Sequence, residues 1–123
     1  MSIEEIIPTL LNPLAGGRVY ESATPDDLVR SGNVIQDFII WHIVGGQDAE
    51  YVDQTMGTHT NARVQIQAVS PSGKAASTLI RAIRDTLLAS DYTVGVYGSP
   101  VGTYDAARKL KGRWQQFSIW SEQ

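Results

Sequence analysis

The segment RVQIQAV, residues 63–69, places the strongest constraint on how this 123-residue chain folds. Its apolar residues Val64, Ile66 and Ala68 alternate with polar ones. Successive side chains of a β-strand point to opposite faces of the sheet, so the alternation predicts a strand that is buried on one side only. The sheet that contains it must therefore be covered on one face and exposed on the other.

Two segments with helical periodicity are suited to supply that cover. The first begins after Ser70-Pro71, because serine is favoured as a helix N-cap and proline at the first helical position. Its apolar residues lie on one helical face: Ala76, Leu79, Ile80, Ile83 and Leu87. The N-terminal segment SIEEIIPTLLNPLAGG, residues 2–17, has a second such stripe, although Pro8 interrupts its hydrogen bonding. Gly16-Gly17 is predicted to end this helix in the left-handed conformation.

Three further segments are typical of strands. FIIWHIV, residues 38–44, is apolar on both faces except for His42, which predicts a central strand covered on both sides. YTVGVYG (92–98) and RWQQFSIW (113–120) complete the set, and in the latter Phe117 and Ile119 share a face with Gln115. The stretches at about 45–61 and 98–111 are predicted to be long flexible loops. We expect one domain over residues 1–123, of the α+β class, with a largely antiparallel sheet and two main helices on one face.

Composition excludes several classes of function. The net charge of −3 argues against a basic face that would bind nucleic acid. The chain has no cysteine, which excludes disulfides and thiolate metal sites. No apolar run approaches the roughly 20 residues of a membrane span, and the acidic N-terminus is unlike a signal peptide. Neither membrane association nor export is expected.

The segment SGKA, residues 72–75, has the outline of a phosphate-binding loop between a strand and a helix. In the motif GxxxxGK[ST], glycine gives the backbone access to phosphate and a hydroxyl binds magnesium. Aligned on Gly73 and Lys74, the chain has Ala68 in place of the first glycine and Ala75 in place of the hydroxyl residue. A nucleotide site is therefore not predicted.

No other group of residues predicts catalysis or a cofactor. His42 lies in an apolar strand and His59 in a polar stretch, and neither has a partner at the spacing of a metal site. The acidic residues Asp48, Glu50 and Asp53 do not match the calcium-binding loop of an EF-hand. We predict no catalytic residue, no cofactor and no metal.

The order of these segments resembles that of a known protein family. The matching stretches are LAGGRVYESATP at the end of the first helix, FIIWHIVGG, ARVQIQAVSPSGKAASTLIRAIRDTL and the closing YDAARKLKGRWQQFSIW. Together they resemble the short tail-completion, or tail-terminator, proteins of tailed phages and prophages. SATPDD departs from the "AP" turn of that family, although Thr24-Pro25 can form the same turn.

The resemblance implies an α+β structural subunit, not an enzyme, that forms a hexameric ring. Such a ring caps the polymerised tail tube, stops its growth and offers a surface for joining the head. The implied partners are further copies of the chain, the major tail tube protein and a head-completion or connector protein, without specific nucleic-acid binding. The implied location is the head–tail junction of the virion, reached from the host cytoplasm during assembly. The free protein is either a monomer or a ring.

Physical reasoning then suggests which residues lie at the interfaces of such an assembly. An acidic first loop and a basic second loop are suited to pair between neighbouring subunits around a ring. Trp120 is predicted to anchor a partner, since tryptophan is frequent in interface hot spots. The loop residues in question are Gln47, Asp48, Glu50, Tyr51 and Asp53 in the first loop and Tyr104, Arg108, Lys109 and Lys111 in the second.

Two other functions fit the same sequence. One is a head-side neck or connector component of the same particle. The other is a small α+β enzyme or ligand-binding domain, in which His42, His59 and the acidic loop converge on a pocket. Both loops are also compatible with a simple solvated role, because exposed charge pairs contribute little.

Overall fold

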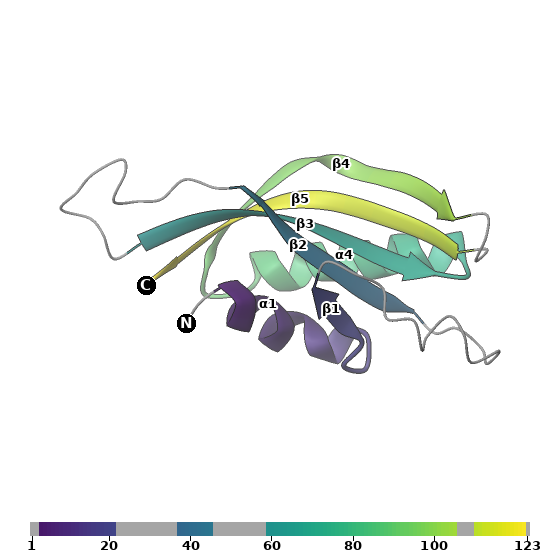
Figure 1. The fold of residues 1–123 in the computed structure, drawn as a ribbon, viewed down its shortest axis with the longest axis horizontal. Helices are drawn as coiled ribbons and strands as arrows, with labels where there is room; N and C mark the ends of the chain where they lie inside the picture. The colour runs from purple at the N-terminus through teal and green to yellow at the C-terminus, as the bar shows by residue number, and fades with distance from the viewer. Residues whose placement is uncertain (1–2, 22–36, 46–58, 106–109, 123) are drawn as a thin grey trace.

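A five-stranded sheet with helices on one side forms the body of the molecule (Figure 1). The computed structural model describes residues 3–21, 37–45, 59–105 and 110–122. The strands are β1 (Val19–Glu21), β2 (Phe38–Gly45), β3 (His59–Ser70), β4 (Thr93–Asp105) and β5 (Leu110–Glu122). Their order in the sheet is β1-β2-β3-β5-β4. All neighbours are antiparallel except β1 and β2, so the predicted α+β class and largely antiparallel sheet are confirmed.

The helices pack on one face of the sheet, as predicted. They are α1 (Ile3–Leu11), a 3₁₀ turn η1 (Asn12–Leu14) and α4 (Gly73–Leu88). The predicted stripe of α4 is buried in one core with α1 and with the inward residues of β2, β3 and β5. Burial of an apolar side chain stabilises the fold by roughly 1.5–3 kcal/mol. The core therefore comes from one face of the sheet and one stripe of each helix.

The N-terminal helix is shorter than its apolar stripe. α1 continues through Pro8 but ends at Leu11, and η1 takes up the next three residues. Gly16 and Gly17 follow with φ of 58° and 82°, the left-handed conformation that the sequence predicted. The chain then turns into β1, which the sequence did not predict as a strand.

The predicted cap of α4 is wrong by two residues. Ser72, not Ser70, is the N-cap, and its Oγ accepts a hydrogen bond from the backbone N–H of Ala75 at 3.3 Å. Ser70 is buried at the end of β3, and its Oγ accepts from the N–H of Ser72. Both serines are good local candidates, and the extension of β3 to Ser70 decides between them.

Two further predictions need correction. The stretch 98–111 is not a loop: residues 98–105 belong to β4 and 110–111 to β5, while 106–109 lie outside the described residues. The first predicted loop is also too long, because β2 runs to Gly45 and β3 begins at His59. Residues 46–58 lie outside the described part of the chain.

β2 is covered on both sides only in its first half. Ile39 and Trp41 enter the main core, and Phe38 is buried on the opposite face with Val69 and Leu110. Ile43 and Val44, at the far end, are exposed. Neither described helix has the length and apolar run needed to cross a bilayer.

Candidate protein-interaction surface

The sheet face opposite the helices carries cross-strand rows of polar and aromatic side chains. Directly paired residues of antiparallel strands point to the same side of a sheet. The register of β3, β5 and β4 therefore gives five rows on this face. They are Asn61–Trp120–Thr93, Arg63–Ser118–Gly95, Gln65–Gln116–Tyr97, Gln67–Trp114–Val101 and Val69–Gly112–Thr103. We call this surface, from β3 to β4, the open face.

Arg63 of β3 reaches across β5 to Tyr97 of β4. Its Cζ lies 4.5 Å from the centroid of the Tyr97 ring, a cation–π contact. Ser118 of β5 is the direct partner of Arg63, and its small size leaves room for the long side chain. Hydrogen bonding from Arg63 is the largest cause that lowers the pKa of Tyr97 from its ordinary 10.0, followed by Ser118, and desolvation opposes the shift.

Two side-chain hydrogen bonds fix other polar groups of the open face. Gln67 Nε2 donates to Thr103 Oγ1 at 3.0 Å, and Asn61 Nδ2 donates to Ser118 Oγ. The first bond passes over Gly112, where a Cβ would come within 2.5 Å of Thr103 Oγ1 and 2.6 Å of Gln67 Nε2. Glycine at this position is therefore required by the bond above it. The open face is a pre-ordered surface.

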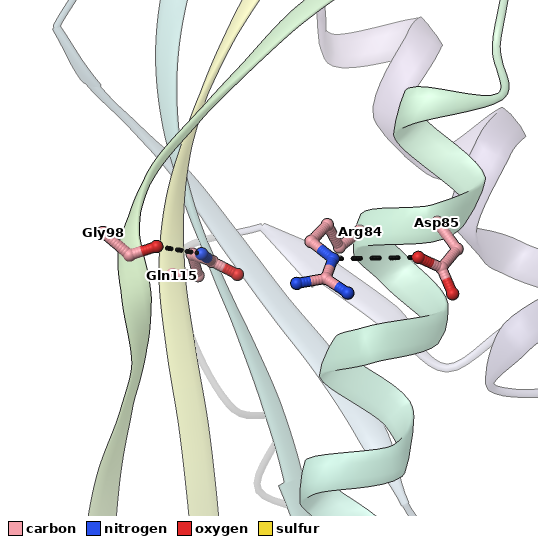
Figure 2. Close-up of polar contacts among 4 residues, drawn as sticks. All are labelled: Arg84, Asp85, Gly98 and Gln115. Carbon is pink, nitrogen blue, oxygen red and sulfur yellow. Dashed lines mark hydrogen bonds and ion pairs between the residues drawn. The ribbon is translucent and has the colours of Figure 1, made fainter.

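On the helix side, a bulge interrupts β4. Tyr97 pairs with Gln116 and Val101 with Trp114, so residues 98–100 stand opposite Gln115 alone. Gln115 is buried, and its Nε2 donates to the carbonyl oxygen of Gly98 at 2.7 Å (Figure 2). Gly98 has φ of 65°, as bulges often require. The Gln115 side chain thus supplies a hydrogen bond where the strand ladder is disrupted.

The side-chain oxygen of Gln115 differs from the side-chain nitrogen in its hydrogen bonding. Its Oε1 is buried and has no hydrogen-bond partner among the described residues. In Figure 2 it points toward the side of α4 that carries Arg84. Arg84 Nε in turn lies 3.7 Å from Asp85 Oδ1, and both side chains are substantially exposed. An exposed pair of this kind contributes little to stability.

The structure separates the predicted interface residues that it describes. Tyr104 and Lys111 are direct cross-strand partners near one end of the β4–β5 ladder, and Lys111 lies on the helix side, beside Gly73. Trp120 lies near the other end of β5, on the open face, and is partly exposed. Tyr104 and Lys111 are exposed as well. The predicted residues outside the described part of the chain are Gln47, Asp48, Glu50, Tyr51, Asp53, Arg108 and Lys109.

Apart from Trp120, the residues of the open face were not predicted to form a surface. Arg63 and Gln67 were recognised only as the polar side of a strand, and Tyr97 as part of a short strand. One signal was available: in residues 93–96, the smaller Thr93 and Gly95 alternate with Val94 and Val96. It was obscured because the Gly and Pro that follow also favour turns.

The described residues give no support to an enzyme site built on the histidines. A groove of about 460 Å³ lies beside the start of α4, and His42 does not line it. Its lining residues are Leu14, Asp37, Ser72, Lys74, Ala75, Thr78, Leu79 and Ala82. His42 lies on β2, two residues after Ile40 of the second cluster. Within the described ranges, no three His, Cys, Asp or Glu side chains gather as a metal site requires.

Comparison with known proteins gives a likeness in structure but none in sequence. No protein-family model and no curated protein sequence matches the chain. The structure, however, is similar to a chain from the virion of a native gene transfer agent particle, with a TM-score of 0.56 and 16% sequence identity. The likeness covers 92% of this chain and 84% of that chain. The two chains share a fold.

Proposed function

We propose that this chain is a structural protein of a phage-like particle. The observation that carries the proposal is the fold shared with a chain of a gene transfer agent virion over 92% of this chain. Two features of the described residues support it: a pre-ordered open face and exposed apolar side chains at the sheet edges. Both are suited to contacts with other proteins.

More specifically, we propose that the protein caps the tail tube as a ring, most simply a hexamer. It thereby ends tail polymerisation and presents a surface to the head-completion or connector protein. The resemblance of the sequence to tail-terminator proteins supports this role. The function is then carried by surfaces and involves no catalysis. These surfaces would act at the head–tail junction.

Length control of tubes tests the proposal directly. Tubes are polymerised from the tail tube protein encoded with this chain, with increasing amounts of the purified protein, and are examined by electron microscopy. We expect tubes to stop growing and to carry a ring at one end, at stoichiometries near one ring per tube. Tubes that grow to the same length and have bare ends would refute the capping role. Binding to the connector protein without binding to tubes would favour a head-side neck component.

A further inference from the structure

β4 is the outer strand of the sheet, and its exposed edge is unusually well suited to pairing. It pairs with β5 on one side, and no described strand lies on its other side. Natural edge strands are commonly protected by charged residues, proline or bulges. From Thr93 to Tyr104 this strand has no charged residue at all. Pro100 and the bulge protect only the centre of β4, which leaves an uncharged segment of the strand on each side of the bulge.

Exposed apolar side chains are concentrated on the same strand. Val96, Tyr97, Val101 and Tyr104 are 36%, 45%, 44% and 61% exposed. They make up four of the eight large apolar side chains that are exposed in the described part of the molecule. Clustered apolar exposure marks an interaction site more reliably than scattered residues do. The edge of β4 therefore combines free backbone groups with apolar side chains.

A second patch with the same character lies at the opposite side of the sheet. β1 pairs with β2 only at Ile39–Trp41, so the segment His42–Gly45 has no described strand on that side. Ile43 and Val44 in this segment are each 42% exposed. We call His42–Gly45 the β2 tip.

The two patches cannot cover each other within one molecule. β3 and β5 lie between β2 and β4. Three strand spacings of about 4.8 Å separate the two edges by roughly 14 Å. Within one molecule, neither patch can therefore be covered by the other, and the two differ in position. Association through two different surfaces is head to tail, and it produces a ring when the rotation between subunits closes.

We propose that copies of this chain join edge to edge, with the outer side of β4 in one copy pairing with the β2 tip of the next. The contact extends the sheet from subunit to subunit through backbone hydrogen bonds, and the apolar side chains of both patches cover one another. The strand segments that meet carry no acidic or basic side chain other than His42, so no strongly charged group loses its water without compensation. The inference rests on the proposed ring and assigns the surfaces that build it.

Disulfide trapping tests this arrangement, and the chain is well suited to it because it has no native cysteine. One cysteine is introduced in β4 (Val96→Cys or Val101→Cys) and one in the β2 tip (Ile43→Cys or Val44→Cys) of the full chain. A disulfide forms only where two Cα atoms approach within about 4.4–6.8 Å. In a glutathione redox buffer, where accidental disulfides are reversed, we expect at least one combination to give a ladder of covalent oligomers beyond the dimer.

Matched controls make the result specific. Leu88 on α4 is 52% exposed, as apolar as the test residues, and belongs to neither edge. Leu88→Cys combined with Val44→Cys should give no ladder. Mixing two single variants, one in β4 and one in the β2 tip, should give a heterodimer and nothing larger. If Val101→Cys alone dimerises efficiently and no combination gives a ladder, two β4 edges pair with each other and the inference is wrong.

Charge substitution provides an independent measurement. Val101→Lys and Val44→Glu should each weaken self-association at least tenfold in sedimentation experiments on the concentrated protein, with unchanged circular dichroism. Mixing the two variants should restore assembly, because lysine and glutamate then meet at every second contact and native edges at the others. Leu88→Lys should behave as the wild type.

The outcomes separate this inference from the proposed function. Variants of both edges that assemble and cap tubes like the wild type would overturn the edge pairing and leave the capping role intact. Edge ladders from the double-cysteine variants, together with a wild type that never shortens tubes, would overturn the capping role and leave the pairing intact. Double-cysteine variants that form no edge disulfide, either free or bound at tube ends, would also overturn the pairing.

Discussion

At the scale of single residues, glycine and arginine positions determine the shape of the open face. Gly112 is required because a hydrogen bond between neighbouring side chains passes directly over it. Arg63 reaches Tyr97 because its direct partner on the intervening strand, Ser118, is small. In both cases a small residue leaves the space that a contact between neighbouring side chains needs.

Gly112→Ala should destabilise the protein by about 1–3 kcal/mol, because the added Cβ displaces Gln67 or Thr103 and breaks their hydrogen bond. The measurement is the free energy of unfolding in urea. Gly95→Ala is the matched control, since its Cβ would make an ordinary contact of 3.6 Å with Ser118 Cβ. Equal stability of the two variants would contradict the close approach.

The Tyr97 phenol should titrate below its ordinary value, because its pKa is lowered first by hydrogen bonding from Arg63. A group with a lowered folded pKa adds stability only as the pH rises through that pKa toward 10.0, so no effect is expected at neutral pH. The measurement is the phenolate absorbance of the wild type minus that of Tyr97→Phe. In Arg63→Gln the pKa of Tyr97 should move back upward; an unchanged titration would exclude the contact in solution.

At the scale of secondary structure, the bulge in β4 shows how one buried side chain maintains an irregular strand. Gln115 donates to Gly98 where three residues of β4 stand opposite one of β5. A bulge on an edge strand increases twist and limits uncontrolled pairing. Gln115 is in this sense a structural residue for the edge that we propose as an interface.

Gln115→Glu tests this role through its pH dependence. The introduced carboxylate would be buried and would face the Gly98 carbonyl oxygen, so its pKa in the folded state should be raised. The variant should lose about 2 kcal/mol or more at neutral pH and regain stability as the pH falls from the raised folded pKa toward roughly 4.3, the ordinary value for glutamate, because a protonated carboxyl can donate. Thermal unfolding as a function of pH measures this, with Gln116→Glu on the open face as control. A loss in Gln115→Glu that does not depend on pH would contradict it.

At the scale of the whole molecule, the order of strands separates a stable centre from an available edge. β3 lies between β2 and β5, and β5 lies between β3 and β4, so both central strands are paired along both sides. β4 is paired along one side. The free energy of local opening is not uniform across a fold, and edge elements open most readily.

Hydrogen exchange should show this difference and its change on assembly. Amides of β3 and β5 should be the slowest to exchange in the free protein, and those of β4 that do not face β5 should be fast. When the protein assembles, amides in β4 and in the β2 tip should gain at least tenfold protection, while those facing the core stay unchanged. Mass spectrometry of peptides from these strands measures both states. Protection gained only elsewhere would point to a different interface.

The sequence by itself determined which side of each of these helices and strands faces the core. The alternation in residues 63–69, the faces of residues 113–120 and the stripe of α4 were all predicted, and the structure confirms them. These features depend on the periodicity of the local backbone, about 3.6 residues in a helix and 2 in a strand. Each apolar or polar residue of a segment is separate evidence for that periodicity. The α+β class follows from the same periods, since amphipathic helices must cover one face of the sheet.

Only the tertiary structure decided which strands are neighbours and therefore which edge is free. Residues 98–105 contain Gly and Pro in a pattern that locally favours a turn. In the structure they continue β4, and residues 101–105 pair with β5. Because β4 is an edge strand, glycine, proline and a bulge are tolerated in it. Arg63 meets Tyr97 because β5 lies between β3 and β4, a placement that no local pattern specifies. Strand order depends on contacts between residues far apart in the chain, and these contacts exist only once the fold is formed.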